Sequence, residues 1–157
     1  MITATILEDE TADGLALRHR ALRESHDPSV QKAALRVLVV DDEALIRWSV
    51  TETLTGLGMT VDQAVDAAST LSAIDAAGWR FDVIVLDLRL PDMDDLALLA
   101  KIRRRAPHAA VVLMTAFGTP EIVTAAYDLG VVNVLNKPFE LEELARVVTA
   151  AGDMTVR

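Results

Sequence analysis

The sequence predicts an α/β fold in which a parallel β-sheet is covered by helices on both faces. Four short apolar runs and one weaker strand segment, 59–64, alternate with five segments of helical periodicity from Arg36 onward, and this alternation is typical of parallel sheets. The runs are rich in valine and leucine without polar alternation, as expected for strands that are buried on both faces. Aromatic residues make up only 4% of the chain, so Ala, Val and Leu must fill the core.

The first half of the predicted domain contains three strands and the two helices between them. The expected elements are strand 36–40, helix 43–56, strand 59–64, helix 67–77 and strand 82–86. Glycines end both helices, at Gly56 and Gly58 for the first and at Gly78 for the second. The first helix carries one apolar stripe, formed by Ile46, Val50, Thr53, Leu54 and Leu57.

The second half continues the alternation. The expected elements are helix 95–105, strand 110–114, helix 120–129, strand 131–135 and helix 140–150. Helix 120–129 has clear end signals, with Thr119 as N-cap, Pro120 at the first helical position and Gly130 just past the end. The last helix buries an apolar stripe formed by Leu141, Leu144, Val147 and Val148.

The chain is expected to hold one domain over residues 36–152, with an extension over 1–35 and a tail over 153–157. The extension has mixed charges and no strand-like run, so it is interpreted as partly disordered or as a short helix. A net charge of −9 argues against a nucleic-acid surface. No run is long enough to span a membrane, no signal peptide is recognisable and cysteine is absent, so we expect a cytoplasmic protein.

Polar side chains follow four of the five predicted strands. These residues are, in chain order, Asp41, Asp42, Asp87, Thr115 and Lys137. Because ligands of open parallel sheets bind at the carboxyl ends of the strands, we expect these side chains to converge. Three carboxylates, a hydroxyl and an ammonium form a site suited to a divalent metal and a transferred phosphoryl group.

Each of these residues alone has a simpler explanation. Asp41 and Asp42 fit the start of a helix, where acidic residues are favoured. Asp87 fits a loop, although a carboxylate there is also a candidate nucleophile. Thr115 is common in strands and Lys137 is most simply solvated. The ordered set carries the prediction, since capping and chance explain one position well and all four poorly.

The segment from Arg36 to about Gly152 resembles the receiver domain of bacterial response regulators. Four motifs carry the resemblance: Val39-Val40-Asp41-Asp42-Glu43, the run from Asp87 to Asp94, Met114-Thr115-Ala116-Phe117-Gly118, and Asn136-Lys137-Pro138-Phe139. Residues 115–121 and 136–140 are most similar to receivers of the enhancer-binding, sigma-54-activating class.

The resemblance implies a flavodoxin-like (βα)5 fold, a doubly wound parallel sheet with strand order 2-1-3-4-5. It implies that Asp87 accepts a phosphoryl group from a sensor histidine kinase or a phosphotransfer protein. It further implies a Mg²⁺ cofactor bound directly by Asp42 and Asp87, through water by Asp41, and by the backbone carbonyl of Arg89. Such a protein is a phosphoacceptor that promotes its own phosphorylation and dephosphorylation rather than a conventional enzyme.

The same resemblance assigns roles after phosphorylation. Lys137 pairs with the phosphoryl oxygens, and Thr115 donates its hydroxyl to one of them and draws the following loop inward. This switches the face formed by helix 120–129, strand 131–135 and helix 140–150. The family usually has an aromatic residue three positions before the lysine, where this chain has Val134. A glycine common in the loop after the phosphoacceptor is here Asp95.

Five further side chains are candidates for protein contacts or for control of the lifetime of the phosphorylated state. Trp48 lies off the buried stripe of its helix and is either a partly buried aromatic or a contact for the kinase. Val123 and Tyr127 lie away from the core stripe and are candidates for a homodimer or partner face. Arg89 and Phe117 each follow a site residue by two positions, and in the family that the chain resembles these positions tune hydrolysis of the acyl phosphate. The resemblance therefore implies that two such bulky side chains favour slow loss of the phosphoryl group.

Three other functions compete with this reading. A degenerate receiver would bind a protein partner constitutively, and Val134 and Asp95 keep this alternative open. A phosphatase with an aspartate nucleophile would need a second acid close after Asp87, where Leu88 and Arg89 stand instead. A flavin or nucleotide site would need a glycine-rich loop after the first strand. The chain is expected to bind neither nucleic acid nor membranes directly.

Overall fold

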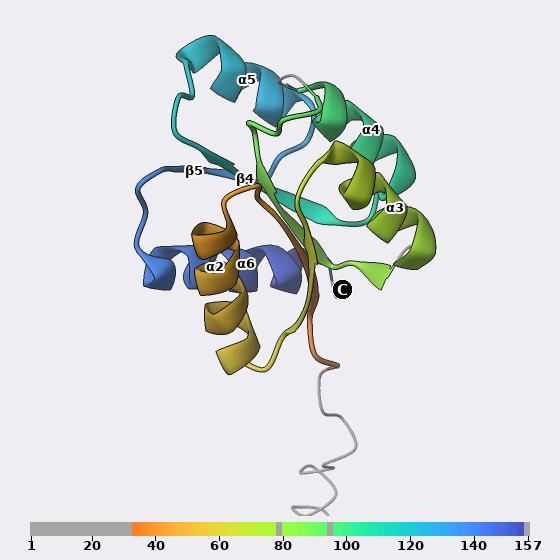
Figure 1. The fold of residues 1–157 in the computed structure, drawn as a ribbon, viewed down its shortest axis with the longest axis vertical. Coiled ribbons are helices and arrows are strands. Elements are labelled where there is room, and N and C mark those ends of the chain that lie inside the picture. Colours follow the sequence, from red (N-terminus) through yellow and green to blue (C-terminus); the bar gives the residue numbers. More distant parts are fainter. Residues whose placement is uncertain (1–32, 78–79, 94–95, 156–157) are drawn as a thin grey trace, which may run out of the picture. The chain divides into compact units, whose positions relative to one another are not determined.

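The sheet of this protein is open, parallel and flanked by helices on both faces (Figure 1). The computed structural model describes residues 33–77, 80–93 and 96–155. The predicted extension lies almost entirely outside the described residues, as do Gly78 and Asp95. The predictions made for them stay predictions.

Five strands lie in the order β2-β1-β3-β4-β5, and all neighbouring pairs are parallel. The strands are β1 (Arg36–Val40), β2 (Thr60–Ala64), β3 (Val83–Asp87), β4 (Ala110–Thr115) and β5 (Asn133–Asn136). This confirms the predicted fold class and strand order. The last strand begins at Asn133, two residues later than expected. Just before it, Val132 already donates its N–H to the carbonyl of Val111 (2.9 Å).

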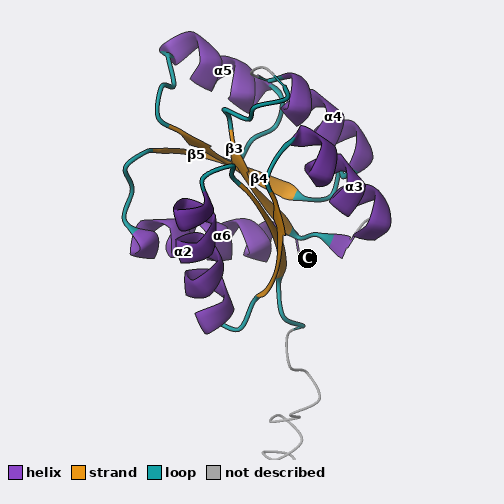
Figure 2. Cartoon of the chain, viewed as in Figure 1, coloured by secondary structure: helices purple, strands orange, loops and turns teal. Residues whose placement is uncertain are grey.

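The helices are α2 (Ala44–Gly56), α3 (Ala67–Ala77), α4 (Ala97–Arg105), α5 (Pro120–Asp128) and α6 (Leu141–Thr155). Helices α2 and α6 cover one face of the sheet, and α3, α4 and α5 cover the other (Figure 2). As predicted, Thr119 caps α5: its side chain accepts the N–H of Ile122 (3.3 Å).

Successive strand residues enter different halves of the core, which explains the unbroken apolar runs. Leu38 and Ile84 pack toward α3, α4 and α5, whereas Val39 and Val85 pack toward α2 and α6. All four side chains are fully buried. Both faces of the sheet therefore need apolar residues along the central strands β1, β3 and β4, whereas the edge strand β2 also carries exposed polar residues such as Asp62 and Gln63.

The predicted stripe of α2 is wrong at its last member. Leu57 is 58% exposed because the helix ends at Gly56 and the chain turns away at Gly58, whose φ is +86°. A left-handed residue after a helix favours glycine. Met59 then enters the core in place of Leu57.

Helix α6 continues to Thr155, beyond its predicted end at 150. The added turn packs Ala151 and Gly152 into the core, and a Cβ atom on Gly152 would collide with the side chain of Leu35. Glycine inside a helix costs about 1 kcal/mol relative to alanine. Close packing against the start of β1 requires it here.

None of the helices in the described ranges is long and apolar enough to cross a membrane.

Candidate functional site

The carboxyl ends of β1, β3, β4 and β5 meet at one edge of the sheet, and the predicted site residues lie there. Val40 pairs with Leu86, which brings the residues after β1 beside Asp87. Asp87 pairs with Met114, and Thr115 pairs with Asn136, the residue before Lys137. The parallel register therefore brings together residues that are up to 96 positions apart in the chain.

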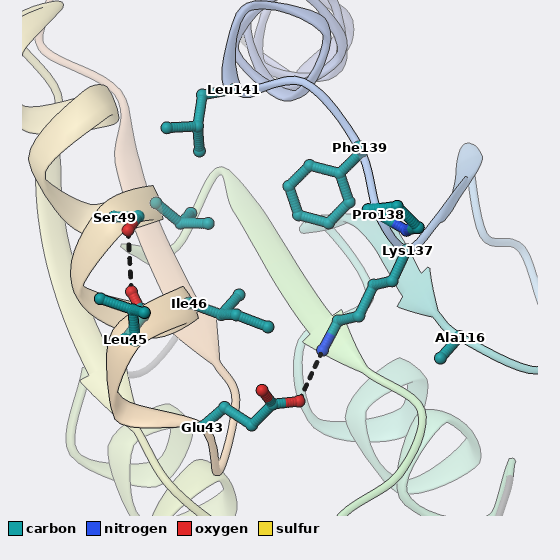
Figure 3. A pocket seen from close by; sticks show the side chains of 10 residues that line it. Glu43, Leu45, Ile46, Ser49, Ala116, Lys137, Pro138, Phe139 and Leu141 are labelled. Carbon is teal, nitrogen blue, oxygen red and sulfur yellow. Dashed lines mark hydrogen bonds and ion pairs between the residues drawn. The ribbon is translucent and has the colours of Figure 1, made fainter.

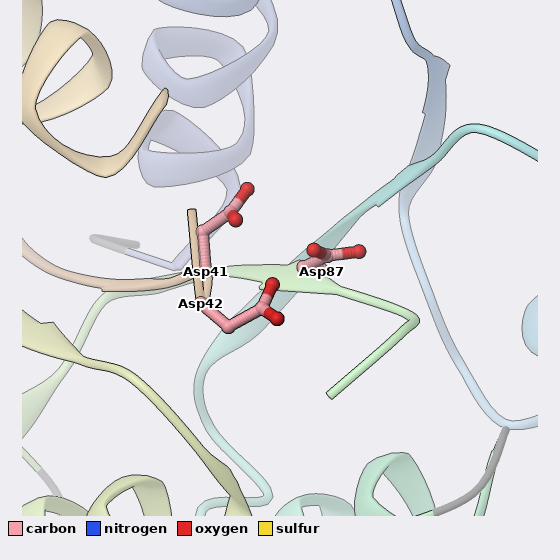
Figure 4. A group of neighbouring side chains, drawn as sticks. All are labelled: Asp41, Asp42 and Asp87. Carbon is pink, nitrogen blue, oxygen red and sulfur yellow. The ribbon is translucent and has the colours of Figure 1, made fainter. Parts of the chain in front are cut away.

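Asp41, Asp42 and Asp87 form a compact acidic group (Figure 4). Each residue offers one carboxylate oxygen, and these oxygens all lie within 4.8 Å of one another. Asp41 is fully buried and Asp87 is 5% exposed, whereas Asp42 is exposed to solvent. An all-oxygen set with one open side fits Mg²⁺, which binds through few carboxylates and keeps several waters.

Lys137 supplies the positive charge of this pocket. Its Nζ atom lies 2.9 Å from Asp41 Oδ2 and 3.2 Å from Asp87 Oδ2, and 3.8 Å from Glu43 Oε1 (Figure 3). The lysine side chain is only 11% exposed. The peptide bond between Lys137 and Pro138 is cis. Glu43, whose ion pair the sequence did not reveal, extends the network to the start of α2.

The electrostatics of the pocket shift two pKa values. Burial raises the pKa of Asp87 above its ordinary value, and the nearby Asp41 adds to the shift; the N–H of Arg89 and the ammonium of Lys137 oppose it. Burial disfavours the charged form of Lys137, but the carboxylates of Asp41 and Asp87 outweigh it and raise the pKa of the lysine. Burial thus favours the neutral form of Asp87, and the Lys137 ammonium and the Arg89 N–H partly offset this effect.

Thr115 is buried at the end of β4, one residue after Met114, which pairs with Asp87. Its Oγ1 atom accepts the N–H of Phe117 (3.2 Å), and its carbonyl accepts the N–H of Lys137 (2.8 Å). The loop after it is tight: a Cβ on Gly118 would lie 2.9 Å from Thr115 Cγ2 and 3.3 Å from Val123 Cγ2. The Thr115 side chain is thus in direct contact with the loop that leads to α5.

Arg89 and Phe117 contact each other beside the pocket. The guanidinium carbon of Arg89 lies 4.3 Å from the centre of the Phe117 ring, within the range of a cation–π interaction. The N–H of Arg89 donates to Asp87 Oδ1 (3.1 Å). Sequence spacing identified both positions. Their direct contact is visible only in the structure, because it joins two separate loops, those after β3 and β4.

The predicted partner residues are differently exposed. Trp48 is 59% exposed on α2, so both predictions for it, a partly buried aromatic and a kinase contact, stay predictions. Tyr127 is 48% exposed on α5, whereas Val123 and Val134 are half-buried, with Val134 packed against the core.

A groove of about 510 Å³ runs between the start of α2 and the loop after β5, beside the acidic pocket (Figure 3). Leu45, Ile46, Phe139 and Leu141 give it an apolar lining, and Lys137 and Glu43 lie at its polar end. The sequence did not reveal this groove, because its lining comes from two segments that are far apart in the chain, the start of α2 and the residues after β5. Leu45, in the first of these segments, is 73% exposed.

Comparison with protein families decides the class of this fold and site. A family model described as "Response regulator receiver domain" matches residues 37–149. The chain belongs to this family. The acidic pocket and Lys137 of this receiver are consistent with phosphoacceptor function.

Curated relatives of this receiver include DNA-binding transcriptional regulators. The NtrC protein of Escherichia coli K12 is 38% identical over 115 residues, which cover 73% of this chain and 24% of NtrC. The transcriptional regulatory protein TcrA of Mycobacterium tuberculosis H37Rv is 36% identical, covering 71% of this chain and 44% of TcrA. The chain therefore spans about a quarter to under half of these relatives. The match to NtrC agrees with the motif resemblance to the enhancer-binding, sigma-54-activating class.

Solved structures give the same family. The receiver domain of NtrX from Brucella abortus is 34% identical with a TM-score of 0.69, covering 74% of this chain and 98% of that domain. A CheY-like receiver domain protein from Methanospirillum hungatei JF-1 is 25% identical with a TM-score of 0.74, covering 78% of this chain and 97% of that protein.

Proposed function

We propose that Asp87 accepts a phosphoryl group from a phosphohistidine of a sensor histidine kinase or a phosphotransfer protein. The observation that carries the proposal is the position of the Asp87 carboxylate. It is almost fully buried, it shares its cation with Asp41, and it lies within 4.8 Å of two further carboxylates. A buried acidic group with one ammonium is suited to receive a second cation and an anionic phosphoryl group.

In the transfer step an Asp87 carboxylate oxygen attacks phosphorus. The new P–O bond forms as the P–N bond of the phosphohistidine breaks, and the leaving imidazole takes up a proton from solvent. The product on Asp87 is an acyl phosphate, a covalent intermediate typical of carboxylate nucleophiles. Lys137 is already within 3.2 Å of Asp87 and can turn from the carboxylate to the new phosphoryl oxygens.

The carboxylates of Asp42 and Asp87 would hold Mg²⁺ directly, with Asp41 acting through water and the backbone carbonyl of Arg89 completing the protein ligands. When bound, the metal supplies positive charge that offsets the charge of the phosphoryl group. Asp41 Oδ1 also accepts the N–H of Glu43 (2.8 Å), which fixes its orientation toward the pocket.

The proposed readout is the face formed by α5, β5 and α6. Thr115 exchanges its contact with the Phe117 N–H for one with a phosphoryl oxygen, and the loop that leads into α5 follows. Val134 lies on this route without an aromatic ring, so rearrangement depends on the loop rather than on a rotating aromatic side chain. Tyr127 and Val123 contribute to a homodimer or partner face, and a phosphorylated protein that stays monomeric at high concentration would count against it.

The groove beside α2 is the proposed docking place of the kinase or phosphotransfer protein. Leu45 and Trp48 lie one helical turn apart and are both mostly exposed, and the groove opens beside the phosphoacceptor. A partner helix with an apolar stripe and a phosphohistidine would bury both side chains and bring phosphorus to Asp87.

The test is the intact mass after incubation with Mg²⁺ and acetyl phosphate. The proposal predicts the gain of one phosphoryl group, lost with a chelator and in Asp87→Ala. Asp75→Ala is a matched control, because Asp75 is an exposed aspartate of α3 that pairs with Arg105 (2.7 Å) outside the pocket. No adduct, under conditions that label a known receiver, would instead favour a degenerate receiver that binds its partner constitutively.

A further inference from the structure

We propose that Asp92 is a positioning residue that couples the metal-binding loop to helix α3. This coupling rests on the proposed function, because it requires that the site around Asp87 binds Mg²⁺. The carboxylate of Asp92 holds the loop after Asp87 in the shape that metal binding requires. Metal binding in turn orders the start of α3.

The carboxylate of Asp92 contacts the start of helix α3 through two hydrogen bonds. Asp92 Oδ1 accepts the backbone N–H of Ala67 (2.7 Å), and Asp92 Oδ2 accepts that of Ala68 (3.0 Å). These two N–H groups begin α3 and have no partner within the helix. A carboxylate is favoured there because the helix dipole places positive charge at this end. The bond joins segments that are 25 residues apart in sequence.

The second observation is that α3 has its own local cap as well. Asp66 Oδ1 accepts the N–H of Ser69 (2.7 Å), and the Asp66 carbonyl accepts the N–H of Thr70 (3.1 Å). Asp66 and Asp92 therefore divide the first four N–H groups between them. One cap comes from the residue next to the helix, and the other comes from the loop after β3.

The third observation is how the loop is fastened at its other end. Leu88 donates its N–H to the carbonyl of Met114 (3.0 Å), and Arg89 donates its N–H to Asp87 Oδ1 (3.1 Å). A turn closed by the Leu90–Met93 bridge then places Asp92 against α3. The backbone between these fixed points contains the carbonyl of Arg89, and Pro91 limits its freedom further.

The consequence is a reciprocal link. If the Asp92 contact holds the Arg89 carbonyl in place for metal binding, it strengthens the affinity for Mg²⁺. Thermodynamic linkage then requires Mg²⁺ to strengthen the contact by the same factor. Mg²⁺ should therefore slow hydrogen exchange at the amides of Ala67 and Ala68, which donate to the Asp92 side chain.

The experiment compares Asp92→Ala with Asp66→Ala in the full chain. Both changes remove a cap from the same end of α3, but only Asp92 belongs to the loop after Asp87. The dissociation constant for Mg²⁺ is measured by calorimetry in about 1 M salt, where a Debye length of about 3 Å suppresses the effect of distant charge. Partners of metal ligands typically change affinity by about 10–100-fold; a residue one step further out should change it about three- to tenfold.

The expected result is weaker Mg²⁺ binding by Asp92→Ala and less than a twofold change in Asp66→Ala. Asp92→Asn keeps one acceptor oxygen and should fall between the wild type and Asp92→Ala, which keeps the test decisive if the alanine variant folds poorly. Equal dissociation constants in all variants, or an equal loss in Asp66→Ala, would overturn the coupling alone. A wild type that binds no Mg²⁺ would overturn the proposed function with it.

Discussion

Replacement of Lys137 by methionine tests whether the ammonium stabilises the pocket as a substitute cation. The side chain is 11% exposed and its Nζ lies 2.9 Å and 3.2 Å from two buried carboxylates. Removal of one partner from a buried ion pair costs about 3–5 kcal/mol. Because Asp42 opens the pocket to water, we expect the lower end, about 3 kcal/mol, in the absence of metal. With a slope of about 2 kcal/mol per M, the urea midpoint should fall by about 1.5 M.

Mg²⁺ should reduce the difference in stability between the variant and the wild type. The divalent ion supplies the missing charge, and in the variant it no longer competes with the ammonium for Asp41 and Asp87. At a concentration 100-fold above the dissociation constant, a ligand stabilises by about 2.7 kcal/mol. The deficit of the variant against the wild type should therefore narrow when urea titrations are repeated in Mg²⁺ instead of chelator. Lys101→Met, on α4 outside the pocket, is the control.

The reasoning would be refuted by a variant that is as stable as the wild type in chelator. It would also be refuted by a deficit of the same size with and without Mg²⁺, since that would show a loss of packing rather than of charge.

Three further predictions concern acidity, lifetime and docking. Since burial raises the folded-state pKa of Asp87 above its unfolded value, the folded protein binds this proton more readily. The stability of the metal-free protein should thus rise as pH falls from neutrality through that pKa, and Asp87→Asn should lack this component in urea titrations over the same pH range. Phe117→Ala should shorten the half-life of the acyl phosphate severalfold, measured by loss of mass after gel filtration, because the ring no longer stacks on Arg89 beside the pocket. A wild-type half-life of seconds would contradict it. Trp48→Ala should slow phosphotransfer from a cognate kinase about tenfold, the effect of about 1.4 kcal/mol of lost contact, and leave labelling by acetyl phosphate unchanged; unchanged transfer from the kinase would remove Trp48 from the docking surface.

The strands were predictable because burial on both faces leaves an unbroken apolar run. The positions of Asp41, Asp87 and Thr115 at the sheet edge follow from those runs and from the parallel register. Helix ends were less predictable because contacts distant in sequence decide them. Helix α6 gains its last turn from packing of Gly152 on Leu35, which no local pattern contains.

The site was predictable in its charged groups but not in its supporting contacts. Four strand-end motifs identified the carboxylates and Lys137, yet the capping of α3 by Asp92 depends on where a loop folds. The ion pair of Glu43 and the stacking of Arg89 on Phe117 also arise between loops. Such contacts leave no periodicity in the sequence, so only coordinates reveal them.

Gly118 has no Cβ, and this leaves room for the side chains of Thr115 and Val123. The carbonyl of Thr115 accepts the N–H of Lys137, which holds the backbone at the end of β4. A Cβ at residue 118 would lie 2.9 Å from the methyl group of Thr115, closer than such atoms normally approach. Even an alanine at residue 118 would crowd the side chain of Thr115 and that of Val123. Such a receiver would keep the charged groups of its acidic pocket but would lack the space that the proposed rearrangement of Thr115 requires.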